Sequence, residues 1–153
     1  MNLIFLDIDG VMNHSNYFVR SKQHMLQAFC PKALVNLKEI LEKCDAKIVV
    51  TSTWRKLGSA NTLKKSIFSH YGLQKYVIGR TPILINEPRG AEIQAFIDNF
   101  NKPIDRFIII DDDDDMLHLS DRLVLTSPYK DGLNERKRDE AIQLLNQDTS
   151  IML

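Results

Sequence analysis

Carboxylates that could bind a metal ion or react with a substrate occur at two places in this sequence. The string "DIDG" places Asp7 and Asp9 two residues apart, ahead of Gly10, and residues 111–115 are five consecutive aspartates. Aspartates with a pKa near the usual value of about 4 are ionised at neutral pH, so neighbouring ones repel unless solvent or a cation intervenes. The run has two interpretations: a solvated acidic turn, or a metal site at the end of a buried strand.

The pair Asp7 and Asp9 has the groups that phosphoryl transfer through a covalent enzyme intermediate requires. One carboxylate attacks phosphorus, and a second, two residues further on, protonates the leaving oxygen and later activates water. Gly10 lets the backbone turn tightly, so that both carboxylates face the substrate. Oxygen ligands of this kind suit a hard cation such as magnesium, which would also relieve the repulsion among the aspartates.

The hydrophobic pattern predicts the elements that must position these residues. Continuous apolar runs indicate buried strands over residues 3–7, 47–52, 76–79, 106–111 and 122–127. Apolar residues at helical spacing indicate helices over residues 31–44, 59–72, 90–100 and 134–147. Strands that alternate with helices predict a three-layer α/β/α, Rossmann-like fold with a central parallel sheet of about five strands.

Polar residues follow three of the predicted strands at the point where each strand ends. The first strand ends in Asp7, the second in Thr51 and Ser52, and the fourth runs into Asp111. In parallel sheets of this class, ligands bind beyond the carboxyl ends of the strands, so we expect these side chains at one edge. Thr51 and Ser52 offer hydroxyl and backbone donors that could hold the oxygens of a phosphoryl group.

A positive side chain is also needed to neutralise a phosphoryl group. Arg89 is the best placed candidate, because it lies just ahead of the helix that leads into the aspartate strand. The N-terminus of that helix adds a partial positive charge. The alternatives are Lys64, Lys65 and Arg80.

In this order the motifs resemble those of the haloacid dehalogenase (HAD) superfamily of phosphohydrolases. The string "FLDIDGV" resembles the first motif, "IVVTS" the second, Arg89 the third and "IIIDDDDDM" the fourth, within residues 3–116. The longer strings "DIDGVMN", "VVTSTWR", "IGRTP" and "RGAEIQAFI" are similar to a narrower group, the HAD-like domains associated with RNA repair. At the third motif the sequence has arginine where the superfamily most often has lysine.

The resemblance implies a role for each carboxylate. Asp7 would be the nucleophile and Asp9 the general acid and base. Magnesium would be bound by Asp7, by the main-chain carbonyl of Asp9, and by Asp111 or Asp112. We therefore expect a magnesium-dependent phosphatase, with Mg²⁺ as its cofactor.

The resemblance also implies how the phosphate is bound and how open the site is. Thr51 would bind the phosphate, with Ser52 as an alternative alignment, and Arg89 would neutralise it. Residues 10–31 leave room only for a flap, and residues 53–88 only for a helix, a strand and loops. We therefore expect no large cap domain. Open sites in the superfamily tend to act on phosphate carried by large substrates, such as a nucleic-acid end or a phosphoprotein.

The function that follows is a magnesium-dependent phosphomonoester hydrolase working through an aspartyl-phosphate, with a nucleic-acid 3′-phosphate as a narrower hypothesis. A phosphatase of small nucleotides or sugars is one alternative. A phosphoacceptor signalling domain of the receiver type is another alternative. Receivers place an acidic pair on the first strand and a lone acceptor later, which is the reverse of the order in this chain. An inactive binding module is a third. Dehalogenase chemistry is disfavoured, because Asp9 supplies an acid and base that phosphate chemistry uses.

Length, net charge, cysteine spacing and the N-terminal sequence limit the kinds of protein that this chain can be. The 153 residues predict a single domain over residues 1–153, and the 20 basic and 20 acidic side chains predict no long-range field and no large basic footprint. Cys30 and Cys44 lack the spacing of a zinc site and are expected to be reduced thiols. The N-terminal apolar run is short and meets Asp7, so we expect no signal peptide or membrane span, a cytoplasmic location and no obligate protein partner.

Several residues beside the motifs have competing interpretations. Trp54 and Arg55 could form a substrate-stacking and phosphate-binding edge, but a packed Trp beside a solvated Arg is favoured. Asn13 and His14 follow the "DIDG" turn and are candidates to touch substrate. One aspartate among residues 113–115 could cap the helix that follows, and the others are expected to be solvated.

Overall fold

The protein is built around one parallel sheet, which a computed structural model describes together with its helices over residues 1–147. The sheet has five strands in the order β3-β2-β1-β4-β5. The strands are β1 Asn2–Leu6, β2 Ala46–Val50, β3 Val77–Arg80, β4 Arg106–Asp111 and β5 Leu123–Leu125. Residues 148–153, the end of the expected domain, lie outside the described part.

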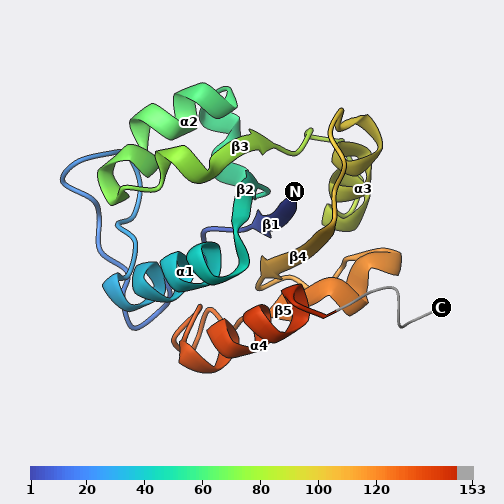
Figure 1. Cartoon of the computed structure of the whole chain (residues 1–153). Helices are drawn as coiled ribbons and strands as arrows, with labels where there is room; N and C mark the ends of the chain where they lie inside the picture. Colours follow the sequence, from blue (N-terminus) through green and yellow to red (C-terminus); the bar gives the residue numbers. More distant parts are fainter. Residues whose placement is uncertain (148–153) are drawn as a thin grey trace.

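Helices cover both faces of this sheet (Figure 1). The α-helices are α1 Pro31–Cys44, α2 Ala60–Ser66, α3 Arg89–Asn99 and α4 Glu135–Leu145. The 3-10 helices are η1 Thr53–Leu57, η2 Phe68–Tyr71, η3 Gln74–Tyr76 and η4 Leu117–Arg122. In residues 1–147, no helix is long and apolar enough to cross a membrane.

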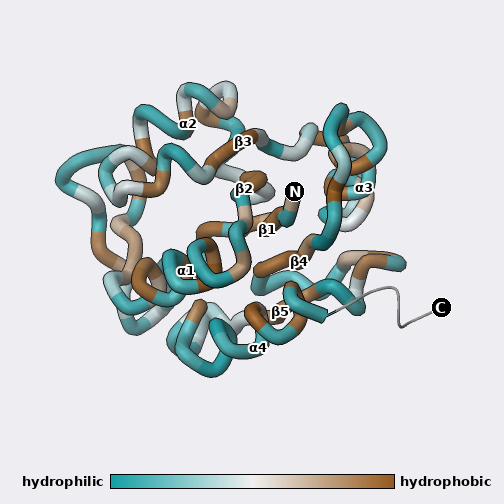
Figure 2. The backbone as a smooth tube through the Cα atoms, viewed as in Figure 1, coloured by the Kyte–Doolittle hydropathy of each residue, from teal (hydrophilic) through white to brown (hydrophobic). Residues whose placement is uncertain are grey.

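The strands are apolar on both faces because each face packs against a separate core. On β1, Ile4 and Leu6 join the core under α1, α2 and α4, whereas Leu3 and Phe5 join the core under α3 and η4. Figure 2 shows the result, with hydrophobic strands at the centre and hydrophilic outer faces on the helices. Such two-sided burial is typical of parallel sheets. The three-layer α/β/α fold predicted from the sequence is confirmed.

The predicted helix over residues 59–72 is interrupted, which corrects the sequence-based boundary. Helix α2 ends at Ser66, Ile67 leaves helical geometry at φ −123°, and the chain continues as η2. Ile67 and Phe68 are both buried. Both side chains belong to the core under α1, α2 and α4, so the break lies at a point where the chain is anchored in that core. Gly72 ends η2 in the left-handed region at φ +70°.

The connection from β1 to α1 forms a flap, defined here as residues 14–28. Its backbone is paired by isolated antiparallel bridges between His14 and Tyr17 and between Arg20 and Gln27. The connection from β2 to β3 holds only η1, α2, η2 and η3. Across residues 1–147 no large cap domain is inserted, as expected. The carboxyl edge of the sheet is therefore covered by short segments.

The first turn of α3 is pressed against the chain that follows β4. The amide of Gly90 donates to the carbonyl of Asp115 at 3.3 Å. A Cβ atom built on Gly90 would lie 2.4 Å from the carbonyl oxygen of Met116. Only glycine allows this approach, which brings the start of α3 to the aspartate run.

We expect Gly90→Ala to lower the thermal unfolding temperature. In a helix without this contact, the change would raise stability by about 1 kcal/mol through helix propensity. Here the added methyl meets main-chain atoms that cannot rotate away, so α3 must shift at a cost of about 1–3 kcal/mol. Thermal unfolding followed by circular dichroism measures the sign, and a higher unfolding temperature would contradict the close packing.

Candidate active site

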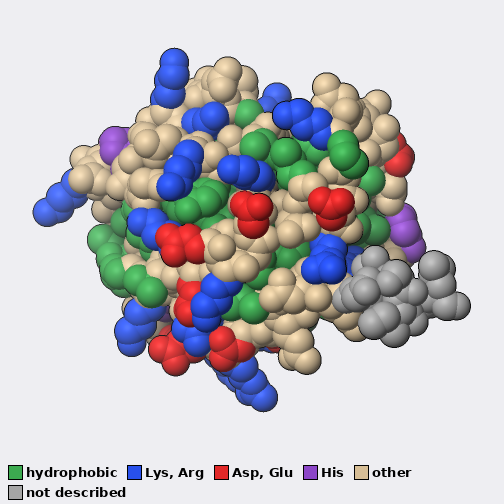
Figure 3. Space-filling view, viewed as in Figure 1, with side chains coloured by type: hydrophobic (Ala, Val, Ile, Leu, Met, Phe, Trp, Pro, Cys, Tyr) green, Lys and Arg blue, Asp and Glu red, His purple; other side chains and the backbone are tan. Residues whose placement is uncertain are grey.

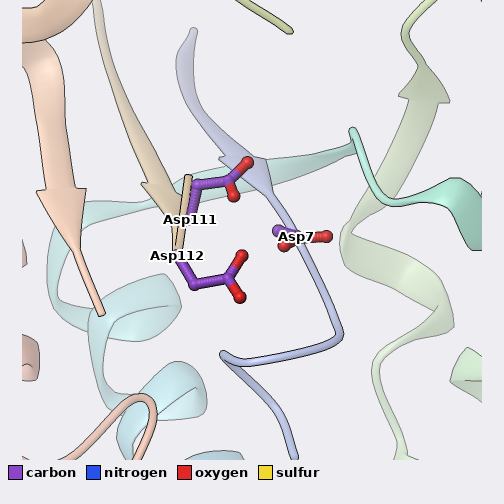
Figure 4. Close-up of side chains that lie close together, drawn as sticks. All are labelled: Asp7, Asp111 and Asp112. Carbon is purple, nitrogen blue, oxygen red and sulfur yellow. The ribbon is translucent and has the colours of Figure 1, made fainter. Parts of the chain in front are cut away.

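Three carboxylates from two neighbouring strands meet at the carboxyl edge of the sheet. Asp7 follows β1 directly, Asp111 is the last residue of β4, and Asp112 comes next. Strands β1 and β4 are parallel and pair Leu6 with Ile110, so their ends lie side by side. One carboxylate oxygen from each aspartate lies within 4.8 Å of the others. Figure 4 shows the three side chains lying close together. The structure thus brings together the aspartates that the sequence predicted.

Arg89, the first residue of α3, bridges two of these carboxylates. Its Nη1 lies 2.8 Å from Oδ2 of Asp111 and 3.2 Å from Oδ1 of Asp7. The side chain is 15% exposed, so one edge remains open to solvent. Within the described residues, neither Arg80 nor the lysines of α2 form an ion pair with these carboxylates. Arg89 is therefore the positive group that the structure places in the site.

Burial and mutual repulsion make the ionised carboxylates unfavourable. Burial, with repulsion from Asp111, raises the pKa of Asp7 to about 9, although Arg89 opposes the shift. Burial also raises the pKa of Asp111, again against the attraction of Arg89. For Arg89 itself, burial favours a lower pKa, but attraction to Asp111 and Asp7 outweighs it and raises the pKa. One guanidinium does not balance three ionised carboxylates.

The residues fit a magnesium ion. Three ionised carboxylates and one guanidinium leave two negative charges, which one divalent cation would balance. The ligand atoms are all oxygens, which magnesium prefers. A Cβ on Gly10 would lie 2.3 Å from Oδ2 of Asp112, and Gly10 has φ +84°. Glycine is therefore required at this position for Asp112 to approach the "DIDG" turn.

The rest of the aspartate run is used in local turns. The amide of Asp113 donates to Oδ1 of Asp111 at 2.9 Å, and the amide of Asp115 donates to Oδ1 of Asp113 at 2.9 Å. Side-chain bonds to an amide two residues on are typical of Asp in turns. The predicted cap is wrong, because η4 begins with Met116 at the N-cap and no side-chain cap bond. Asp113, Asp114 and Asp115 are exposed to solvent, and only Asp111 and Asp112 of the run belong to the site.

Thr51 and Ser52 differ in what their hydroxyls can do. The Thr51 hydroxyl is buried and has no hydrogen-bond partner among residues 1–147. The Ser52 hydroxyl accepts from the amide of Trp54 at 3.2 Å and caps η1. A buried hydroxyl without a partner is costly, so an oxygen-rich ligand beside Thr51 would remove a penalty.

The Asp9 carboxylate is held by two donors from different loops. Oδ1 accepts from Nδ2 of Asn13 at 2.9 Å, and Oδ2 accepts from Nε1 of Trp54 at 3.1 Å. Asn13 also accepts from the amide of Gly10 at 3.1 Å, which fixes its orientation. Trp54 is packed, as predicted, but its N–H partner was not predicted. A buried Trp usually needs a hydrogen-bond acceptor for its N–H, so the prediction that Trp54 is packed could also have predicted a partner for it.

Comparison with known families agrees with this geometry. Residues 3–137 match the family described as the HAD domain in Swiss Army Knife RNA repair proteins. The chain belongs to this family. Membership confirms the HAD-like domain related to RNA repair and supports phosphohydrolase chemistry of the HAD type. No curated protein matches the chain significantly.

The HAD domain also contains a buried ion pair that the sequence did not predict. Arg55, expected to be solvated, is only 4% exposed, and its Nη2 lies 2.7 Å from Oε2 of Glu92. Its Nη1 donates to the carbonyls of Thr51 and Ser52. Oε2 of Glu92 also accepts from the amide of Leu84 at 2.9 Å. The pair ties together the loops after β2 and β3 and helix α3.

This ion pair connects the two parts of the HAD site that face a phosphate. Glu92 lies three residues after Arg89 on α3, so both side chains project from the same region of the helix. Arg55 fixes the main chain of Thr51 at the other end. The sequence could have indicated this pair through Glu92, a charged residue beside the apolar positions of a helix, which would need a buried partner. We infer that the Arg55–Glu92 pair sets the distance between Arg89 and Thr51.

We expect Asp112→Asn to raise the thermal unfolding temperature of the HAD domain in EDTA above pH 9, where Asp7, with its pKa raised to about 9, is ionised. Under those conditions, removing one negative charge relieves repulsion worth about 1–2 kcal/mol, or several degrees. Magnesium should then raise the unfolding temperature of the wild type more than that of Asp112→Asn, because binding to the native state stabilises it. Asp114→Asn, an exposed change in the same run, is the control. If magnesium raised the unfolding temperature of all three proteins equally, Asp112 would not be part of a magnesium site.

The Arg55–Glu92 pair can be tested apart from its effect on stability. Glu92→Gln should cost about 3–5 kcal/mol of unfolding free energy, because it leaves a buried guanidinium unpaired. The double change Arg55→Met/Glu92→Leu replaces both charges by apolar groups and should cost less, about 1–3 kcal/mol, because the amide of Leu84 and the carbonyls of Thr51 and Ser52 lose their side-chain partners. We still expect the double variant to bind orthophosphate about tenfold more weakly, since Thr51 and Arg89 lose their fixed spacing. If orthophosphate inhibits the double variant and the wild type equally well, the Arg55–Glu92 pair has only a structural role.

Proposed function

We propose that the protein is a magnesium-dependent phosphomonoester hydrolase that forms an aspartyl-phosphate on Asp7. The supporting observation is the convergence of Asp7, Asp111 and Asp112 beside Arg89 at the carboxyl edge of the sheet. Family membership supports the same class of chemistry. Each remaining residue of the site has a role that its position supports.

In the first step, a carboxylate oxygen of Asp7 attacks phosphorus, and the bond between phosphorus and the ester oxygen breaks. Asp9 gives its proton to that leaving oxygen. In the second step, Asp9 takes a proton from water, whose oxygen attacks phosphorus. The bond to Asp7 breaks, which releases inorganic phosphate and restores the carboxylate. Asn13 and Trp54 hold Asp9 in orientation through both steps.

Magnesium would be held by Asp7, the main-chain carbonyl of Asp9 and Asp112, with Asp111 beside them. When bound, the ion supplies the positive charge that lets Asp7 and a phosphoryl group approach each other. Asp111 holds Arg89 through Oδ2. The exposed edge of Arg89 is placed to neutralise the phosphoryl oxygens.

The phosphate would also be held from the β2 side of the site. The free hydroxyl of Thr51 donates to one phosphoryl oxygen. Ser52 would contribute through its backbone, since its hydroxyl caps η1. These donors lie on the other side of Asp7 from Asp111 and Asp112, because β1 separates β2 from β4 in the sheet.

For the substrate, we propose a phosphate at a nucleic-acid end, with the 3′-phosphate as the specific hypothesis. The relation of the family to RNA repair supports this class of substrate. The short segments that cover the carboxyl edge support it too, because they leave room for a long chain attached to the phosphate. A small nucleotide or sugar phosphate would need less access.

We expect release of phosphate from an aryl phosphate to require magnesium and to stop in EDTA. Asp7→Asn should lower kcat by at least about 10³-fold because no nucleophile remains, and Asp9→Asn by about 10²–10⁴-fold because proton transfer is lost. Asp114→Asn is the matched control and should retain activity. Oligonucleotides with 3′ or 5′ phosphates then identify the preferred end. Hydrolysis that survives Asp7→Asn, or a stable phosphoprotein without turnover, would overturn the mechanism.

A further inference from the structure

The balanced total of charges conceals an uneven distribution along the chain. Residues 1–86 carry twelve basic and five acidic side chains, whereas residues 87–153 carry eight basic and fifteen acidic ones. No acidic residue occurs in residues 10–38 or in residues 46–86. The first range contains the flap, and the second contains β2, η1, α2 and β3. The expectation that zero net charge excludes a basic surface therefore fails on this side of the molecule.

The flap and the segment after β2 pack against each other beside the site. The ring of His24, in the flap, lies 6.0 Å from the ring of Trp54 and contacts the Tyr71 hydroxyl. Phe29, just after the flap, stacks on Tyr71 with ring centroids 4.1 Å apart. Trp54 in turn donates to Asp9. Trp54 and Phe29 are buried, so these contacts hold the flap against η1, and the outer faces of the two segments form one surface beside Asp9.

Exposed side chains of two kinds alternate on this surface. On the flap, Phe18 is 63% and Met25 66% exposed, and the basic residues Arg20 and Lys22 lie between them and are also exposed. Lys56 on η1 is exposed as well. Figure 3 shows Lys and Arg side chains over α2 and β3 without acidic ones among them. Apolar faces beside cations suit stacked bases joined by phosphates.

The opposite side of the site has the reverse charge. Asp113, Asp114 and Asp115 follow β4 and are exposed. A polyanion attached to the reacting phosphate would be repelled there and attracted toward the flap. The electric field across the site therefore points from the basic β2 side to the acidic β4 side, and a polyanion is driven in the opposite direction, toward the β2 side.

We propose that the flap and η1 bind the single-stranded nucleic-acid chain that carries the terminal phosphate, with Arg20 and Lys22 contacting its phosphodiesters and Phe18 stacking on a base. This inference deepens the proposed function, on which it rests. A phosphoprotein fits less well, because the surface pairs its cations with exposed apolar side chains. The chain leaves the site on the side away from the exposed aspartates.

The test compares Arg20→Glu/Lys22→Glu with Lys75→Glu/Lys102→Glu, which makes the same charge change at exposed residues that precede β3 and β4, at the amino edge of the sheet. The probes are a labelled single-stranded oligonucleotide with a 3′-phosphate and an aryl phosphate that has no chain. We expect the flap variant to bind the oligonucleotide about tenfold more weakly at low ionic strength. The slope of log K against log salt should become shallower by about 0.7 for each phosphate that the variant no longer neutralises. Phe18→Ala should weaken binding without changing that slope.

Each outcome of the comparison decides the inference. Equal weakening in the two double variants, or an equal decrease of kcat/KM for the aryl phosphate and the oligonucleotide, would overturn it. Binding of an acidic phosphopeptide that depends on Arg20 and Lys22, with no oligonucleotide binding, would assign the surface to a phosphoprotein and also overturn it. Fluorescence anisotropy in the Asp7→Asn background measures binding without turnover. Flap-dependent binding by a protein that hydrolyses no phosphate would refute the proposed function alone.

Discussion

The site depends on repulsion between buried carboxylates that a single guanidinium only partly offsets. Asp7, Asp111 and Asp112 meet because β1 and β4 are parallel neighbours, and the geometry of the sheet leaves them no way to separate. Arg89 holds two of them, and the remaining negative charge matches a divalent cation. The repulsion lowers the stability of the protein when no cation is bound, and binding of a cation removes this loss.

Much of the surrounding structure serves to hold Arg89 in place. Gly90 lets the first turn of α3 approach the backbone of the aspartate run, and Glu92 ties the same helix to Arg55. Arg55 in turn fixes the carbonyl of Thr51. Because Arg89 and Thr51 are linked through buried contacts, the structure itself sets their spacing. Such preorganisation matters where a reacting phosphoryl group must meet several donors at once.

The distribution of charge gives the open site a direction. A zero total predicts no long-range field, yet the flap and η1 are basic and the chain after β4 is acidic. The site lies between these two regions, with cations on one side and exposed aspartates on the other. The absence of a large cap in residues 1–147 leaves that field exposed to a long substrate.

The sequence by itself determined the five strands, the order of helices and the strand-end positions of Asp7, Thr51 and Asp111. These follow from local patterns, because apolar runs report burial and parallel strands end at a common edge. Only the tertiary structure decided the partners. Arg55 and Glu92 are 37 residues apart, and Trp54 and Asp9 are 45 apart. Such pairs depend on how distant elements pack, which hydrophobic periodicity does not encode, and the same holds for the break at Ile67 and for the aspartates taken up in turns.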